Sequence, residues 1–401
     1  MIGVYLPCIQ EKKSMYYLGI DIGKKFHEAC LVNQKGEIII APFRFSNTRL
    51  GFNLLREKIS AFPVKDCLIG MEATGHYWLN LYSELKKDYL MKVINPLQSD
   101  SLRNLYLRKV KTDKKDCLII TDLLRIGNLE ETGVLDPRIR QLRQLSRFRY
   151  ELISQVKAQK QRIVGILDIT FPEYQGFFCS PFTKFSRKLL KKWSTPEKLE
   201  KVSVSQLKRL FKGRGRKPSP ERMKEMLSSA RESIGQTEIL DALILQLRLL
   251  LEQLEFIERQ IEVVEEQIKK TLSQIPQKLT TIPGIGEILA GAIIGEIGDI
   301  ARFSSKKKLV AYAGLDASVR ESGQFVGTRN HISKRGSSYL RKAIWQAAVV
   351  SCRFNPKLRE FYQKKLIEGK KPMVAQGAIA RRLTHIIYAI LRTNQDYNPN
   401  L

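Results

Sequence analysis

Four acidic residues are candidates for chemistry because of their positions in the sequence. Asp21 interrupts an apolar, strand-forming run at residues 15–25, and Glu72 ends a second short apolar run. Asp113 and Asp116 are three residues apart, so they share one face if the segment is helical. A buried carboxylate is costly unless something pairs with it. Taken singly, Asp21 is better explained as a satisfied structural acid, and the 113/116 pair as acids that stabilise a helix start.

Taken together, the four acids predict a metal site. Two carboxylates at strand ends and a pair on a helix are how a ribonuclease H-like fold gathers oxygen ligands. Mg²⁺ takes few carboxylates, at about 2.0–2.1 Å, and keeps places for phosphate oxygens and water. Two such ions about 3.5–4 Å apart serve phosphodiester chemistry. Without metal, converging carboxylates repel one another. We therefore expect Mg²⁺, or Mn²⁺, to be bound by Asp21, Glu72, Asp113 and Asp116.

An α/β domain over residues 15–130 is expected to position these acids. Strand-like runs on either side of a turn at Gly36 predict a hairpin, which makes three antiparallel strands with the run that holds Asp21. Ser46 or Asn47 is expected to cap the helix that follows, and Thr112 the helix of the acid pair. The predicted order is βββαβαβ, with elements after the first at residues 27–32, 37–45, 50–59, 67–71, 76–85 and 91–94.

The composition points to a polyanionic partner. The 401 residues carry a formal net charge of +29, from 69 Lys and Arg against 40 Asp and Glu. Such an excess favours nucleic acid or an anionic surface. We find neither an apolar run long enough to span a membrane nor a secretory signal at residues 1–14, which we interpret as an extension upstream of Met15. The six widely spaced cysteines form no C-x-x-C pair, which indicates reduced thiols in a cytosolic protein.

The middle of the chain is predicted to be helical. Residues 131–235 form a basic helical region and linker, and an arginine-rich helix opens at Asp136-Pro137. Its basic face, including Arg143 and Arg147, is a candidate phosphate-binding surface; the alternative is a solvated basic face. Residues 236–275 carry apolar side chains at alternating steps of three and four, which favours a self-associating coiled coil. The alternative is one long helix packed within its own chain.

Residues 276–395 are predicted to form a mainly α-helical second domain. Thr281–Ala290 is similar to a helix-hairpin-helix turn, in which Pro283 ends one helix while Gly284 and Gly286 let backbone N–H groups reach a phosphate. The alternative is an ordinary helical hairpin. The serines of the loop that follows have capping or turn roles by default. Further candidate phosphate contacts are Lys111, Lys114, Lys115, Arg320, Lys334 and Arg335.

Three motifs around the acids resemble those of the DEDD transposases of the IS one-ten family, which includes Piv- and MooV-type DNA invertases: Gly19-Ile-Asp-Ile-Gly23, Met71-Glu-Ala-Thr-Gly75 and Lys111-Thr-Asp-Lys-Lys-Asp116. Cys117 stands where the family more often has Ala. The resemblance implies an RNase H-like domain similar to the RuvC resolvase, with the same four acids. It covers roughly residues 15–130 and 275–390 and matches the middle only in its helical character.

The resemblance also implies a nucleophile. The segments 311–315, 320–324 and 332–336 are similar to the family's C-terminal domain, in which a serine of a Ser-Gly motif attacks DNA. By motif order this serine is Ser322, with Ser333 as the fallback; the residues alone leave Ser318, Ser337 and Ser338 equally open.

The function that the resemblance implies is that of an insertion-sequence transposase or site-specific recombinase. Such an enzyme cuts and rejoins donor and target double-stranded DNA through a Mg²⁺-assisted serine. The resemblance further implies a noncoding bridge RNA as guide, a homodimer or homotetramer, and a place at the nucleoid in bacterial or archaeal cytoplasm, without a membrane partner. The alternatives are a metal-only nuclease of the Holliday-junction resolvase type, an actin-like ATPase, and a non-catalytic nucleic-acid scaffold.

Overall fold

The computed structural model describes residues 15–72, 76–94, 113–127, 135–211, 218–318, 321–322, 325–326 and 331–399. At residues 113–115, 321–322 and 325–326 it describes the backbone alone. The chain forms two compact units, Met1–Val134 and Leu135–Leu401.

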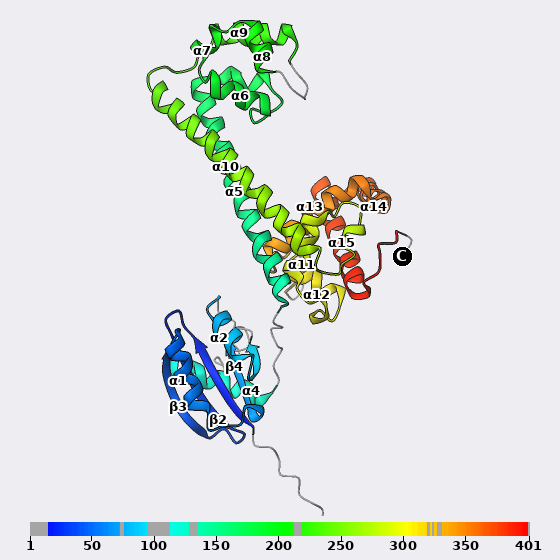
Figure 1. Ribbon diagram of the computed structural model, residues 1–401. Helices are drawn as coiled ribbons and strands as arrows, with labels where there is room; N and C mark the ends of the chain where they lie inside the picture. The colour runs from blue at the N-terminus through cyan, green and yellow to red at the C-terminus, as the bar shows by residue number, and fades with distance from the viewer. Residues whose placement is uncertain are drawn as a thin grey trace, which may run out of the picture. The chain divides into compact units, whose positions relative to one another are not determined.

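The first unit is built on one mixed five-stranded sheet (Figure 1). Its spatial order is β3-β2-β1-β4-β5, in which β1, β2 and β3 are antiparallel neighbours while β1, β4 and β5 run parallel. The turn between β2 and β3 contains Gly36 at φ 88°, as the hairpin prediction requires. The predicted βββαβαβ order is confirmed by the strands β1 Tyr16–Ile22, β2 Phe26–Asn33, β3 Ile38–Ser46, β4 Cys67–Glu72 and β5 Leu90–Ile94.

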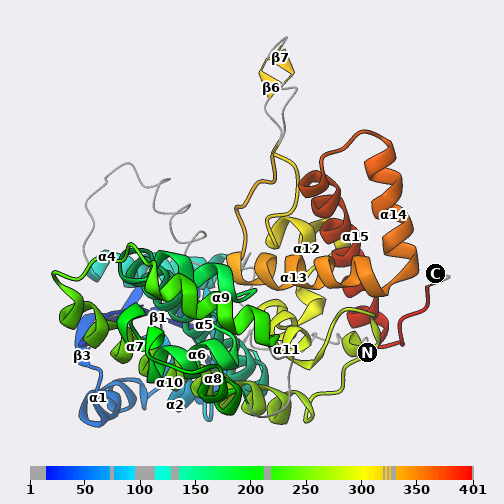
Figure 2. The ribbon, with the colours of Figure 1, turned by 90° about the horizontal axis from the view of Figure 1, so that it is seen from above.

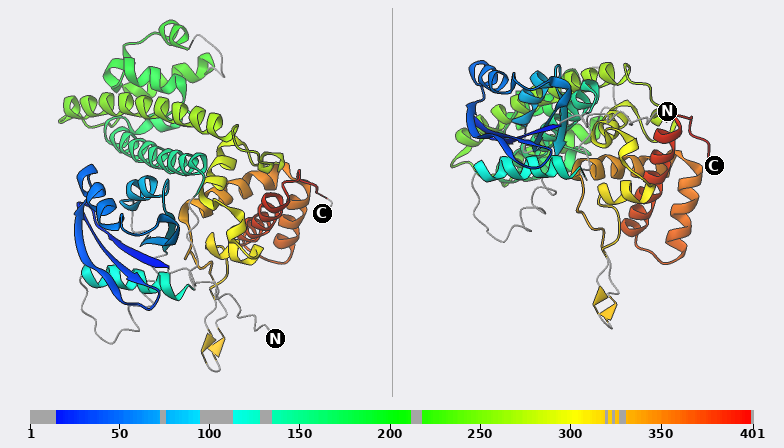
Figure 3. Two further views of the ribbon diagram at one scale, coloured as in Figure 1. Left: turned by 60° about the horizontal axis from the view of Figure 1, so that its bottom comes forward. Right: turned by 90° about the horizontal axis from the view of Figure 1, so that it is seen from below.

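Helices cover both faces of the sheet. α1 (Arg49–Ile59) and α2 (Trp78–Leu85) lie on one face, and α4 (Asp113–Ile126) lies on the other (Figure 3). The first face holds the larger core, which includes Leu18, Ile20, Leu55, Ile69 and Leu81. The prediction that Ser46 or Asn47 caps α1 was wrong, because the Thr48 side chain accepts the hydrogen bond from the Gly51 N–H.

Two glycines let α4 lie close against the sheet. Gly19 of β1 and Gly70 of β4 are register partners. A Cβ at Gly19 would lie 2.7 Å from the backbone nitrogen of Thr121, and one at Gly70 would lie 2.6 Å from Leu124 Cδ1. A larger residue at Gly19 would meet the backbone of α4 and push the helix away from the strands, whereas one at Gly70 would meet the Leu124 side chain. Because side chains alternate along a strand, residues two positions further along β1 and β4 face α4 as well.

The second unit is organised by two long antiparallel helices, α5 (Pro137–Thr170) and α10 (Leu240–Leu272). Ion pairs between Arg149 and Glu265 and between Lys160 and Glu258 connect the two helices and show their opposed directions. The apolar seam of α10 is buried within the chain at Leu243, Leu247, Leu251, Leu254, Ile257, Val264 and Ile268. α10 is therefore a long helix packed within its own chain, as the alternative expected, and self-association through a coiled coil stays a prediction.

Short helices enclose a second core at one end of the α5–α10 pair. They surround the buried rings of Phe171, Tyr174 and Phe211, in a region that the sequence left without assigned elements beyond its helical character. The elements are η2 Pro172–Phe177, α6 Lys184–Lys192, α7 Pro196–Glu200, α8 Val204–Leu210 and α9 Pro220–Arg231.

The other end of the pair carries the predicted mainly α-helical part. α11 (Glu287–Ile297) is buried all round from Ala290 to Ile297 and packs between α5, α10 and α13. β6 and β7 lie away from the helices in Figure 2. The elements are η3 Leu279–Thr281, η4 Ile300–Arg302, α12 Lys306–Tyr312, β6 Glu321–Ser322, β7 Phe325–Val326, α13 Ser338–Phe354, α14 Pro356–Ile367 and α15 Pro372–Thr393. Among the described helices, none is both long enough and apolar enough to cross a membrane.

Candidate carboxylate site and the serine-bearing loop

The parallel pairing of β1 and β4 brings two of the four predicted acids to one edge of the sheet. Ile20 pairs with Met71, and Asp21 and Glu72 are the next residues along their strands. Each lies two residues beyond one of the glycines beneath α4, so both side chains project toward that helix. The sequence placed these acids at strand ends, and the ladder makes the two strand ends neighbours.

The helical acids lie on α4. Asp116 is buried, with 5% of its surface exposed, in the turn of α4 that crosses β1 at Gly19. Asp113 begins α4, but its side chain lies outside the described part of the chain. Among the described side chains, no three His, Cys, Asp or Glu residues converge closely enough to hold a metal ion. The complete four-acid ligand set therefore stays a prediction.

A further acid, Glu28, lies beside Asp21 and was missed from the sequence. The two residues are register partners in the β1–β2 ladder, so their side chains share the α4 face. Glu28 is 4% exposed, and its Oε1 accepts a 2.7 Å hydrogen bond from Arg44 Nε. Its Oε2 is buried and has no hydrogen-bond partner among the described residues. The signal that marked Asp21, an acid within an apolar strand, is present at Glu28 too.

Two thiols lie between α4 and the sheet, Cys117 of α4 and Cys30 of β2, and the acids beside them affect the pKa of Cys117. The pKa of the Cys117 thiol is raised, first by its hydrogen bond with Cys30 and then by burial. The negative charges of Glu28 and Asp21 raise it further. Cys117 is therefore a neutral, packed side chain close to both acids, which suits a position where the resemblance allows Ala.

The loop between α12 and α13 begins and ends in a short antiparallel stem. Ala317 bridges to Ile332, the Ser318 N–H donates to the His331 carbonyl at 2.7 Å, and the Ser333 hydroxyl donates to Asp316. Ser333, the fallback nucleophile, is thus engaged in the stem.

Ser322 lies further out along the loop, in β6, where its backbone pairs with Phe325 of β7. Its side chain lies outside the described part, as does Arg320.

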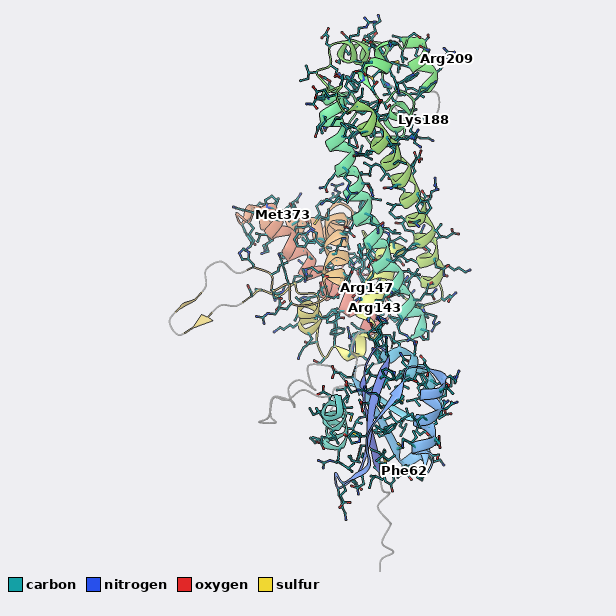
Figure 4. The ribbon with its side chains drawn as sticks, turned by 90° about the vertical axis from the view of Figure 1, so that its left-hand side faces the viewer. Phe62, Arg143, Arg147, Lys188, Arg209 and Met373 are labelled. Carbon is teal, nitrogen blue, oxygen red and sulfur yellow. The ribbon has the colours of Figure 1, made fainter. Side chains whose placement is uncertain are left out.

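The two arginines predicted to bind phosphate are used inside the chain. Arg147 donates from Nε and Nη2 to the two carboxylate oxygens of Glu296, at 2.6 and 3.1 Å. Arg143 donates to the backbone carbonyls of Gly295 and Glu296, at 2.7 and 3.2 Å. Figure 4 shows both arginines on α5, one turn apart. A phosphate-binding role for either residue stays a prediction, and it would compete with these bonds.

Gly284 serves the packing of the second unit. It adopts φ 103°, and a Cβ there would lie 2.6 Å from the Ser351 backbone nitrogen of α13. Its close approach is therefore to its own chain. The helix expected to end at Pro283 is instead the 3-10 turn η3. Gly286 precedes α11, whose N-terminus has no side-chain cap, and a Cβ there would meet nothing within 4 Å.

The remaining basic residues are only partly described. Lys334 and Arg335 are exposed directly after the stem, and Lys334 adopts φ 54°. Lys114 and Lys115 lie in the first turn of α4, where the backbone alone is described, and Lys111 lies outside the described residues.

The fold and the acids together define a class of protein. A mixed sheet in the order β3-β2-β1-β4-β5, with acids at the ends of β1 and β4 and on the helix that covers them, fits an RNase H-like domain. Residues 18–172 match the DEDD transposase domain of IS110 elements, and residues 276–363 match the transposase domain of the IS116/IS110/IS902 family. The chain belongs to the IS110 family of transposases.

Relatives span almost the whole chain. It is 25% identical to the pilin gene-inverting protein of Moraxella bovis, over 97% of this chain and 99% of that protein. It is 22% identical to the 43.6 kDa protein of insertion element IS110 from Streptomyces coelicolor, over 96% of each. A shorter match, 36% identical over 29% of each chain, is to the 42 kDa protein of insertion element IS900 from Mycobacterium paratuberculosis.

Membership of the DEDD transposases usually implies a bound divalent metal ion, and the predicted acids fit such an ion. The donor set consists of carboxylate oxygens, which hard divalent cations prefer. The buried Oε2 of Glu28 is a carboxylate oxygen on the α4 face that no hydrogen bond from the described residues satisfies.

Proposed function

We propose that this transposase cuts and rejoins DNA at a composite site made of the four acids and Ser322. One observation carries the proposal: the β1–β4 register sets Asp21 and Glu72 side by side under the helix of Asp113 and Asp116. Phosphodiester chemistry needs carboxylates held together in this way. Mg²⁺, when bound by these four acids, would polarise the scissile phosphodiester and favour loss of the serine proton.

Ser322 is the nucleophile in this proposal. Its Oγ attacks the phosphorus, the bond to one strand end breaks, and that end leaves as a free hydroxyl. The resulting phosphoserine ester conserves the energy of the broken bond, so rejoining needs no ATP. The reaction requires that Ser322 of the second unit reach the acids of a first unit, in the same chain or in another copy. A homodimer or homotetramer supplies both possibilities.

The charge of +29 supports two polyanionic partners, donor and target double-stranded DNA and a structured bridge RNA that selects them. Base pairing by such an RNA would give target choice, since protein contacts to phosphates carry little sequence information. Gly286 contributes through the uncapped N-terminus of α11 in a helix-hairpin-helix arrangement. We place the activity at the nucleoid, in bacterial or archaeal cytoplasm. The other phosphate contacts in this proposal are Gly284, Lys111, Lys114, Lys115, Arg143, Arg147, Arg320, Lys334 and Arg335.

The test is a search for the covalent adduct. The full chain is incubated with Mg²⁺, the noncoding RNA and DNA containing the ends of its element, and adducts are mapped by mass spectrometry. We expect an adduct at Ser322 that both Ser322→Ala and Asp21→Asn abolish, while Ser338→Ala, at an exposed serine, retains it. Continued cleavage by Ser322→Ala would identify a metal-only nuclease instead. Unchanged recombination by Asp21→Asn would identify a non-catalytic scaffold.

A further inference from the structure

We propose that Glu28 is a fifth carboxylate of the divalent-cation site, a positioning residue whose Oε2 faces the cation or its bound water beside Asp21. This inference rests on the proposed function, because it assigns a residue to the same site. Glu28 stands outside the four-acid set that names the family, and it lies on β2, a strand that contributes no member of that set.

Position is the first support. Glu28 and Asp21 are directly opposite each other on neighbouring antiparallel strands. In such pairs the Cβ atoms lie about 4.5–5.5 Å apart, and two like charges there destabilise the sheet. Their shared face is the one that α4 covers, because Gly19 contacts α4 two residues before Asp21. A divalent cation between the two strands would attract both carboxylates.

The state of the Glu28 carboxylate is the second support. Its side chain is 4% exposed, so water hydrates it poorly. Arg44 reaches Oε1 from a side chain that is 57% exposed, while Oε2 is buried without a partner among the described residues. Leaving a buried charged oxygen unsatisfied costs several times more than a neutral hydrogen bond returns. A structural ion pair with Arg44 explains one oxygen only, and a cation or its water explains the other.

The test measures metal binding by the full-length chain, without DNA. Mn²⁺ is titrated by calorimetry into the wild type, Asp21→Asn, Glu28→Gln and the control Glu37→Gln, which removes an exposed acid of the adjoining hairpin. We expect Asp21→Asn and Glu28→Gln each to weaken Mn²⁺ binding, the latter by about ten- to a hundredfold, as removal of an orienting carboxylate does elsewhere. Glu37→Gln should bind like the wild type.

A second variant keeps the test decisive if Glu28→Gln fails to fold. Arg44→Gln removes the cation next to Glu28 and leaves its carboxylate in place, so Mn²⁺ should bind at least as tightly as to the wild type. Weaker binding to Arg44→Gln would show that Glu28 acts only through its ion pair and would overturn the inference. Wild-type affinity in Glu28→Gln, with binding lost in Asp21→Asn, would overturn it while leaving the proposed metal site intact. A wild type that binds no Mn²⁺ would overturn both.

Discussion

A single substitution, Glu296→Gln, tests whether the second unit is held together by a buried ion pair. Glu296 is 1% exposed and lies among the buried residues of α11, which are otherwise apolar or Gly. Its oxygens accept two hydrogen bonds from Arg147 of α5 and one from the Ser337 hydroxyl, at 2.8 Å. Ser337 caps α13, so one carboxylate joins three helices at the base of the serine-bearing loop. The hydrogen bond with Glu296 also raises the pKa of Arg147, which keeps the guanidinium charged.

The expected loss in the free energy of unfolding depends on how deeply Glu296 and Arg147 are each buried. Removing one partner of a fully buried ion pair costs about 3–5 kcal/mol, because the other charge is left without compensation. The Arg147 side chain is 39% exposed, so water recovers part of its charge. Gln also keeps one oxygen that can accept from Ser337. We therefore expect Glu296→Gln to lower the free energy of unfolding of the second unit by about 2–3 kcal/mol.

The assay is urea unfolding of the full chain, followed by the fluorescence of Trp345 in α13. Trp78 and Trp193 are replaced by Phe, so that the signal reports the second unit alone. Glu265→Gln is the matched control, because Glu265 pairs with an α5 arginine at 2.6 Å but is 30% exposed. It should cost at most about 1 kcal/mol. The reasoning from burial would be refuted if Glu296→Gln and Glu265→Gln lowered the free energy of unfolding equally. It would also be refuted if Glu296→Gln lowered it by less than about 0.5 kcal/mol.

Three further perturbations follow from the geometry. Gly284→Ala should lower the melting temperature, because its φ of 103° and its contact with α13 exclude a Cβ. Gly286→Ala is the milder control: a Cβ there meets nothing within 4 Å, so the variant loses only the preference for Gly over Ala at the N-cap and should lower the melting temperature less. Gly19→Ala should destabilise the first unit and weaken Mn²⁺ binding, because the new Cβ pushes α4 and Asp116 off the sheet. An unchanged affinity for Mn²⁺ would contradict the proposal that Asp116 of α4 is part of the metal site. The side chain of Arg138 holds the pKa of Asp136, the N-cap of α5, at about 2. The ionised Asp136 carboxylate stabilises the folded chain fully above about pH 4, and this stabilisation is lost as the pH falls through about 2. The difference in melting temperature between the wild type and Asp136→Ala should therefore become smaller between about pH 4 and pH 2.

The first unit could be predicted from its sequence because its signals are local. Apolar runs of strand length, a turn with Gly36 and helical spacing after each strand specify the order of elements. The simplest sheet with that order of elements has β1 and β4 as parallel neighbours, and the structure has this sheet. Which residue caps α1 was not predictable, since Ser46, Asn47 and Thr48 are all good caps, and the folded chain uses Thr48, whose backbone is extended just before the helix.

The second unit resisted prediction because its decisive contacts are distant in sequence. The apolar seam of α10 is the same whether a second copy or α5 fills it, and only the tertiary fold chooses. The arginines of α5 likewise look like a phosphate-binding face until a partner is known, and the acid that binds Arg147 is 149 residues away. Composition gives the total charge, but it does not show which charges are already neutralised within the chain.

One sequence signal, an acid within an apolar run, marks Asp21, Glu28 and Glu296 alike, and their surroundings separate them. At Glu296 both carboxylate oxygens accept hydrogen bonds from Arg147 or Ser337, so the chain itself supplies the compensating charge and the residue can be purely structural. At Glu28 the described residues satisfy one oxygen and leave the other buried. A divalent cation bound at the α4 face, or its bound water, would satisfy that second oxygen. Metal binding to the α4 face of the first unit is therefore the measurement on which the proposed metal site and the proposed role of Glu28 depend.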